Sequence, residues 1–292
     1  LSVGFGIIIT YSSYVKRNDD IALAGLTAAA GNGFCEVVLG GLITIPAAFV
    51  FLGPVFMASD HGTFDMGFQA LPNVFNQMWG GNFFGFLFFF LLFLAAVTSS
   101  LSMLQSSIAL LEEGLGLDRK TSVAILGFIA AIGSMFVVIN SKGLVALDTL
   151  DFWVGTFCIY IIATVQVIMF SWIWGMKPGM EELRNGAEIK IPGILWFVLK
   201  FVTPVMMLVI FAFWIYAEFI KPLLTDDPAV WEASRLSQIV APTDNGSIVR
   251  QSLLLMLIVF LLLNILVYRS VRRWKRLEKQ KAASEQGEEY NI

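Results

Sequence analysis

The chain has 292 residues, of which 57% are hydrophobic and 14% are charged. A soluble domain carries about a quarter charged residues, so this composition excludes soluble globular folding. The net charge of −3 provides no broad basic surface, and nucleic-acid partners are not expected. Cys35 and Cys158 lie inside apolar runs, and the single histidine, His61, has no Cys or His nearby. Neither a disulfide framework nor a zinc site is expected.

Several uncharged runs are long enough to cross a membrane, which takes about 20 helical residues. The run 66–111 exceeds one helix, and its first part is rich in Pro, Gly and Asn, so the helix within it covers about 82–111. The six predicted spans are 37–59, 82–111, 121–141, 152–176, 191–217 and 251–268. Residues 1–15 are apolar but short, and we expect the chain to start inside a span. The sequence thus predicts an all-α polytopic membrane protein.

The basic residues predict the orientation, because Lys and Arg accumulate on the cytoplasmic side of a membrane protein. Fourteen of the 19 lie in alternate loops and in the tail that begins at Arg269, whereas four lie on the opposite side. The C-terminus is therefore expected in the cytoplasm. The loop 54–81, which has no basic residue, is expected to form a folded external hairpin. The basic start of the tail suits anionic lipid headgroups.

Polar residues inside apolar spans are the informative positions, because lipid cannot satisfy them. Gly4 and Gly6, with Ser2, open the first apolar segment. They permit either close packing between helices or a broken helix whose free backbone groups face a substrate. Both interpretations stay open on these residues alone.

Asn32 and Glu36 lie four residues apart and share one helical face. An amide oxygen and a carboxylate can together serve a hard cation such as sodium, which prefers oxygen ligands. The alternatives are a helix N-cap for Asn32 and a cytoplasmic interface position for Glu36.

The span 82–111 carries a dense hydroxyl cluster in its middle and inner part. Thr98, Ser102 and Gln105 fall on one stripe of the helix. Small-residue packing and a cation site are both compatible with this cluster.

Asp148 and Asp151 lie at the outer end of the span 152–176, where two carboxylates complement the helix dipole. An external gate would need a basic partner, and no such residue is evident nearby in the sequence.

The order of several separated motifs resembles the neurotransmitter:sodium symporter family, specifically its LeuT-type bacterial amino acid transporters. These motifs are SVGFG, TYSSYV, DIALAGLTAAAGN, EVVLGG, IPAA, LPNVF, TSSLSMLQ, LEEGL and LDFWVGT. The resemblance implies an inverted-repeat fold in which Leu1 lies in the middle of the sixth transmembrane helix. Residues 1–176 would then form helices six to ten of the second repeat, 177–268 the accessory helices eleven and twelve, and 269–292 a cytoplasmic tail.

The resemblance also assigns site residues, each ion site being completed by helices that precede Leu1. Substrate would contact Ser2, Phe5, Ser99 and Met103. Two sodium ions would bind, the first through Asn32 and the second through the Ala95 carbonyl with Thr98 and Ser99. Glu36 would supply the negative charge that chloride supplies in relatives with serine at that position. The gates would be Asp151 on the outside and, on the inside, Tyr14, Gln105 and Glu113.

These assignments imply sodium-coupled, chloride-independent symport of neutral amino acids, with hydrophobic ones favoured. The partners expected are an amino acid, sodium ions and the lipid bilayer of a bacterial inner membrane, and a homodimer is kept open. The alternative is a membrane scaffold or receptor on the same fold that does not transport. An enzyme is not expected, because no paired catalytic carboxylates, His-Cys cluster or phosphate-binding glycine loop lies at membrane depth.

Overall fold

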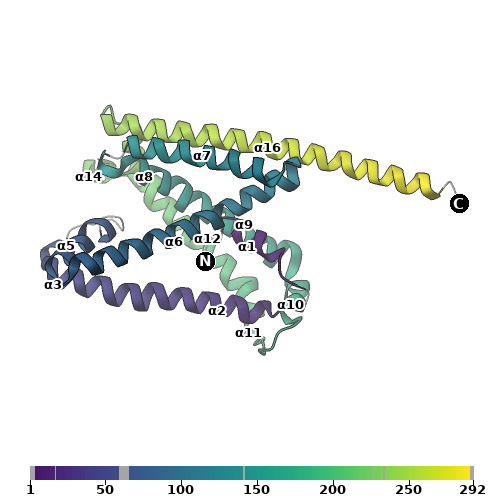
Figure 1. The fold of residues 1–292 in the computed structure, drawn as a ribbon, viewed down its shortest axis with the longest axis horizontal. Helices are drawn as coiled ribbons and strands as arrows, with labels where there is room; N and C mark the ends of the chain where they lie inside the picture. Colours follow the sequence, from purple (N-terminus) through teal and green to yellow (C-terminus); the bar gives the residue numbers. More distant parts are fainter. Residues whose placement is uncertain are drawn as a thin grey trace. The chain divides into compact units, whose positions relative to one another are not determined.

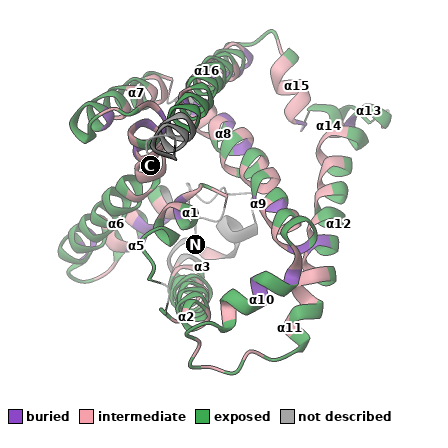
Figure 2. Cartoon of the chain, turned by 90° about the vertical axis from the view of Figure 1, so that its right-hand side faces the viewer, coloured by how far each residue is buried: buried purple, intermediate pink, exposed green. Residues whose placement is uncertain are grey.

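A computed structural model describes residues 4–16, 18–58, 66–140, 142–225, 227–232 and 234–289. The structure is 87% helical, and its described part contains no strand. Six helical stretches are long and apolar enough to cross a membrane: Ile21–Ala47, Gly81–Leu115, Arg119–Ile139, Val145–Arg184, Ile194–Leu224 and Asp244–Gln280. The predicted all-α, six-span architecture is confirmed. Most residues of these helices are not buried by the rest of this chain (exposed residues are green in Figure 2). Such surfaces can face lipid or other helices in a membrane.

The first span begins earlier than predicted. A helical run starts at Ile21 and passes through α2 (Ile21–Gly33) and the π-helical segment η1 (Phe34–Gly40) into α3 (Gly41–Ala58), which is kinked at Gly53, where φ is +81°. The prediction that the span starts at residue 37 is wrong. Asn32 and Glu36 had marked a boundary in the sequence, yet the helix continues through both because they pair with each other.

The chain divides into two compact units. The first comprises residues 15–102 and 182–191, and the second comprises residues 2–14, 103–181 and 192–292. Helix α6 (Gly81–Ala109), labelled in Figure 1, begins in the first unit and ends in the second according to their residue ranges.

In the first unit, the region predicted as an external hairpin is largely helical. Besides the end of α3, it contains η2 (Met66–Ala70) and α5 (Leu71–Gln77), while residues 59–65, with His61, lie outside the described part. Phe75 of α5 packs against Phe88 and Phe89 of α6, with ring centroids 5.5 and 6.2 Å apart. This aromatic contact holds α5 against the start of α6.

The second unit contains most of the remaining elements. They are α1 (Ile7–Ser12), η3 (Leu110–Leu115), α7 (Arg119–Ile139), η4 (Lys142–Leu144), α8 (Val145–Leu150), η5 (Asp151–Cys158), α9 (Ile159–Ile168), η6 (Met169–Gly175), α10 (Met176–Arg184), α11 (Ile194–Phe197), η7 (Val198–Val202), α12 (Thr203–Ile215), η8 (Tyr216–Ile220), α13 (Lys221–Leu224), α14 (Pro228–Glu232), α15 (Arg235–Val240) and α16 (Asp244–Glu289). The last residues of α10 belong to the first unit.

Aromatic packing joins the spans Val145–Arg184 and Ile194–Leu224. Phe157 packs against both Phe211 and Trp214, with ring centroids 6.2 and 5.7 Å away, and these two rings also lie 6.2 Å from each other. At the other end, Ser171 Oγ donates to the Leu199 carbonyl at 2.8 Å. Polar side chains thus find partners on the neighbouring helix, as the interior of a membrane requires.

Asp20 ties the start of α2 to the segment that follows α10. Its Oδ1 accepts a hydrogen bond from the Leu23 N–H at 2.8 Å, and its Oδ2 accepts one from the Glu188 N–H at 2.7 Å. These two backbone donors, Leu23 first, hold the pKa of the Asp20 carboxyl below its ordinary value of 3.8. The charged form of Asp20 therefore favours the folded arrangement.

We expect Asp20→Asn to lower the melting temperature at neutral pH, because an amide has only one acceptor oxygen for two donors. Since the folded-state pKa of Asp20 is lowered, its stabilisation is complete above about pH 3.8 and is lost as the pH falls through the lower pKa. Tryptophan fluorescence melts of wild type and variant should therefore converge in acid. Asp19→Asn, whose side chain accepts only from the Lys16 N–H among the described residues, is the control. A difference that widens as the pH falls would contradict the assignment.

Candidate functional site

Asn32 and Glu36 form a polar pair on an otherwise apolar helix. The Asn32 Nδ2 donates to Glu36 Oε2 at 2.9 Å. The amide thus turns its NH₂ group toward Glu36 and its oxygen away. Among the described residues, no hydrogen bond to the Asn32 Oδ1 is present, so this oxygen can act as a ligand.

The structure decides between the interpretations that the sequence left open for this pair. The N-cap of the helix is Asp20, and Asn32 lies in the last turn of α2, where the helix continues into η1. Glu36 lies about 24 Å along the helix from Asp20, at a rise of 1.5 Å per residue. The capping role for Asn32 is therefore wrong, and Glu36 lies deep within the span Ile21–Ala47.

A second oxygen cluster lies on α6. The Thr98 hydroxyl donates to the carbonyl oxygens of Ala95 and Leu94, at 3.0 and 3.1 Å. Ser99 follows on the next position of the same helix, and all of these residues are exposed. The hydroxyl and carbonyl oxygens predicted for the second sodium site are thus neighbours, while no hydrogen bond or ion pair among the described residues joins this cluster to Asn32.

The segment before α1 is not helical. Gly4 and Gly6 have φ of +92° and +78°, which side chains other than glycine rarely adopt, and α1 begins only at Ile7. A Cβ on Gly4 would also lie 2.8 Å from the Ile159 carbonyl oxygen. The structure therefore supports both the broken-helix and the close-packing interpretations. Phe5, between the glycines, is 40% exposed, as is Met103, and Ser2 lies outside the described residues.

The residues predicted for the inner closure come together in part. Gln105 Nε2 donates to the Tyr14 hydroxyl at 3.3 Å, and Arg119 Nη2 donates to Gln105 Oε1 at 3.4 Å. Arg119 also lies 3.8 Å from Glu112 Oε1. In the sequence Arg119 is only one of the basic loop residues, because its partners Gln105 and Glu112 lie on other elements, α6 and η3.

Asp118 places Arg119 at the start of α7. Its carboxylate accepts from the Thr121 hydroxyl at 2.6 Å and from the Thr121 N–H at 3.2 Å. These bonds, the hydroxyl first, hold the pKa of Asp118 below its ordinary range. The carboxylate is therefore a charged N-cap that fixes where the helix begins.

At the predicted outer end, a basic partner that sequence analysis did not find binds Asp148. Both terminal nitrogens of Arg235 donate to the Asp148 carboxylate, and the guanidinium lies 4.6 Å from the centre of the Phe152 ring. No basic residue is evident near the two aspartates in the sequence, and the partner of Asp148 in the structure is Arg235, 87 residues away. The carboxylate of Asp151 instead lies over Gly155 on its own helix, where a Cβ would come within 2.7 Å of its Oδ1.

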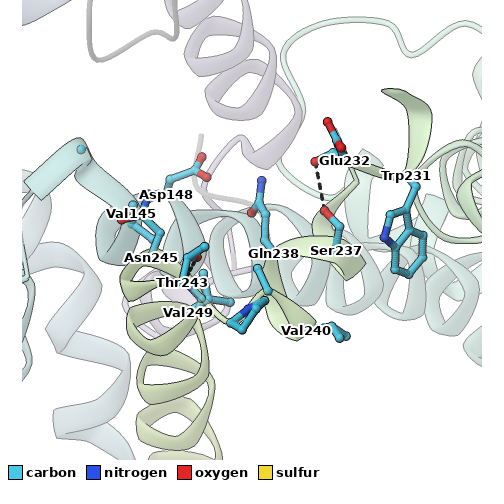
Figure 3. Close-up of a pocket in the computed structure, with 14 residues that line it drawn as sticks. Val145, Asp148, Trp231, Glu232, Ser237, Gln238, Val240, Thr243, Asn245 and Val249 are labelled. Atoms are coloured by element: carbon cyan, nitrogen blue, oxygen red, sulfur yellow. Dashed lines mark hydrogen bonds between the residues drawn. The ribbon is translucent and has the colours of Figure 1, made fainter. Parts of the chain in front are cut away.

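Asp148 also lines a cavity of about 710 Å³ (Figure 3). Its other walls come from the segment 231–243 and from the first turns of α16. Figure 3 shows the hydrogen bond that the Ser237 hydroxyl donates to the Glu232 carbonyl within this wall, at 3.0 Å. Among the lining residues are two carboxylates, Asp148 and Glu232, and no basic side chain.

Three of the acidic residues singled out in the sequence lie in π-helical segments. Glu36 lies in η1, Glu113 in η3 and Asp151 in η5. Such segments are frequent at functional sites, because the wider turn displaces backbone groups from the regular α-helical ladder. No pattern in the sequence distinguished these turns from α-helix.

Comparison with known proteins identifies the family. The model of the sodium:neurotransmitter symporter family matches residues 1–240. An uncharacterized sodium-dependent transporter of Haemophilus influenzae is 29% identical over 72% of this chain and 47% of its own length. One from Methanocaldococcus jannaschii is 27% identical over 71% of this chain and 42% of its own. The sodium-dependent nutrient amino acid transporter 1 of Drosophila persimilis is 26% identical over 73% of this chain and 33% of its own.

The chain thus spans about half the length of the curated relatives that it matches, or less. The family match covers more than four-fifths of the chain and includes every site residue predicted from the sequence. Together with the six membrane-length helices, it places the chain in a class of multi-pass membrane transporters that depend on sodium. The chain belongs to the sodium:neurotransmitter symporter family.

Proposed function

We propose that the protein couples sodium entry to the uptake of neutral amino acids, with hydrophobic side chains favoured, by alternating access. The observation that carries the proposal is the hydrogen bond between Asn32 and Glu36, which turns the amide oxygen away from the carboxylate. A free amide oxygen beside a fixed negative charge is a suitable ligand for a hard cation. The name of the Drosophila relatives, nutrient amino acid transporters, supports the substrate class.

A second sodium ion is proposed at the Ala95 carbonyl and the hydroxyls of Thr98 and Ser99. The Thr98 hydroxyl lies 3.0 Å from the Ala95 carbonyl oxygen, so both oxygens can face one ion. Each ion site would be completed by oxygens from helices that precede this chain in the full-length protein. Residues 1–176 would form the second repeat, 177–268 the accessory helices, and 269–292 a cytoplasmic tail.

The substrate is proposed to bind beside the non-helical segment at Gly4 to Gly6. Backbone groups that are not used in a helix can bind the charged ends of an amino acid, and Ser2 would contribute in this way. Phe5 and Met103 would contact the substrate side chain, and Ser99 would lie at the same pocket. The apolar character of Phe5 and Met103 favours hydrophobic amino acids.

Coupling arises because sodium binds more tightly when the substrate carboxylate completes its site. When one ligand raises the affinity for a second, the second raises the affinity for the first by the same factor. Substrate binding should therefore weaken without sodium. Tyr14, Gln105 and Glu113 would close the inner side, and Asp151 the outer side. The excess of basic residues in alternate loops supports a cytoplasmic C-terminus in a bacterial inner membrane.

Uptake of a radiolabelled neutral amino acid by the full-length protein in liposomes tests the proposal. Asn32→Ala and Thr98→Ala should each raise the sodium concentration for half-maximal uptake about tenfold or more, because each removes a ligand of a charged ion, worth about 1.5–3 kcal/mol.

In two matched control variants, the sodium concentration for half-maximal uptake should stay within about twofold of the wild-type value, because the bonds that they remove hold no ion. Asn264→Ala removes an amide that donates to the Phe260 carbonyl at 2.8 Å within a span. Thr164→Ala removes a hydroxyl that bonds the Tyr160 carbonyl as Thr98 bonds Leu94. Unchanged sodium dependence in Asn32→Ala and Thr98→Ala would refute the ion sites. Wild-type protein that binds substrate without moving it would favour a receptor.

Glu36 is proposed to make transport independent of chloride, because its fixed carboxylate places a negative charge near the first sodium ion. Replacement of chloride by gluconate should therefore leave wild-type uptake unchanged. Glu36→Ser removes the charge, and its uptake should fall about tenfold in gluconate and recover in chloride. Wild-type uptake that is stimulated by chloride would refute this role.

A further inference from the structure

The end of the α6–η3 helix is bound by side chains of α16. Segment η3 ends at Leu115 and is capped by Gly116, where φ is +71° and whose N–H donates back to the Glu112 carbonyl at 2.9 Å. Neighbouring carbonyls are bound by another helix. Arg273 Nη1 lies 3.3 Å from the carbonyl oxygens of Glu113 and Gly114, and Trp274 Nε1 lies 3.1 Å from that of Glu113. Cationic donors at the C-terminal end of a helix are favoured by its dipole.

Glycine at positions 114 and 116 makes this approach possible. A Cβ on Gly114 would overlap the Ser270 hydroxyl and lie 3.0 Å from the Ser270 Cβ. A Cβ on Gly116 would overlap the guanidinium of Arg273. Ser270 is 8% exposed, so it has little room to move aside. The backbone of η3 therefore lies directly against α16, and we call this contact, formed by Gly114, Gly116, Ser270, Arg273 and Trp274, the tail clamp.

The tail clamp lies close in sequence to the residues proposed for the inner closure. Gln105, which bonds Tyr14, lies in the same helical run, and Glu112, which faces Arg119, is one residue before Glu113. A helix end that is held in place also fixes the side chains that precede it. Loss of the tail clamp should therefore loosen the contact between α1 and α6, where Thr10 Oγ1 donates to Ser106 Oγ at 3.2 Å.

We propose that Arg273 and Trp274 are positioning residues that hold the inner end of α6–η3 in its closed place, so that the start of the cytoplasmic tail favours inner closure. This inference rests on the proposed transport function. On the predicted cytoplasmic side, water can replace the bonds to the two carbonyls when the tail clamp opens. The tail clamp therefore shifts the equilibrium between the open and closed inner side toward closure, and it does not prevent opening.

Adjacent Arg272 provides a matched control. Its guanidinium lies 4.4 Å from the ring of Tyr268 on its own helix, so Arg272→Ala removes the same charge from the same region without touching η3. Trp274→Phe removes only the indole N–H and keeps most of the ring. Arg273→Lys keeps the charge and a donor, and should restore part of the effect of Arg273→Ala.

The experiment uses Thr10→Cys in the full-length protein in liposomes, with Cys35 and Cys158 replaced by alanine, as the common background of every variant, so that loss of the Thr10 hydroxyl affects all of them equally. A charged thiol reagent is applied from the cytoplasmic side, in sodium and in potassium. Arg273→Ala should speed labelling in sodium about five- to tenfold, and Trp274→Phe about two- to threefold, whereas Arg272→Ala should stay within about twofold of the background. Equilibrium substrate binding at saturating sodium and the melting temperature should change little, which separates positioning from general destabilisation.

A second pair of variants tests the contact itself. Gly114→Ala should speed labelling as Arg273→Ala does, because its methyl group overlaps Ser270. Adding Ser270→Gly removes the overlapped atoms and should return the rate toward the background. Labelling rates of Arg273→Ala and Gly114→Ala equal to that of Arg272→Ala would overturn the inference. Absence of wild-type uptake would refute the proposed function, yet the rates in potassium would still show whether the tail clamp holds α1 against α6.

Discussion

A polar side chain in a helix of membrane length needs a partner within reach, and the hydrogen bond between Asn32 and Glu36 meets that need within one helix. The amide NH₂ group donates to one oxygen of the Glu36 carboxyl group. Within the pair, the amide oxygen of Asn32 and the other carboxyl oxygen of Glu36 have no partner. A cation that binds there would satisfy both. The same bond explains how an apolar helix can continue from Ile21 through these two residues without a break.

Backbone groups meet the same requirement at the places where helices break or end. At Gly4 and Gly6 the chain adopts left-handed conformations, and its backbone leaves the helical ladder before α1. At the end of η3 the carbonyls of Glu113 and Gly114 are bound by side chains of α16. The first break lies at the proposed substrate site, whereas the carbonyls at the second are bound by side chains of another helix. This contrast separates a proposed binding site from a structural contact.

Sequence alone predicted the six spans and the polar positions on α6, because long apolar runs and their interruptions have a clear period and length. It misplaced the start of the first span, since two polar residues that satisfy each other look like a boundary when their pairing is not known. It missed Arg235 as the partner of Asp148, because a bond across 87 residues leaves no local pattern. Bonds from Arg273 and Trp274 to backbone carbonyls leave none either, because every residue has a carbonyl.

The continuity of α6 would give a physical route from the proposed ion site to the proposed inner closure. Thr98 and Gln105 lie seven residues apart on one uninterrupted helix, about 10 Å along its axis. If such a helix moves as one rigid element, a sodium ion at the proposed site would, by fixing the hydroxyl of Thr98, also limit where Gln105 can lie relative to Tyr14. Held at its far end by Arg273, the helix has less freedom to pivot about the ion. Sodium and the tail clamp would then bias one rigid element toward the same closed position, and their effects on closure should reinforce each other.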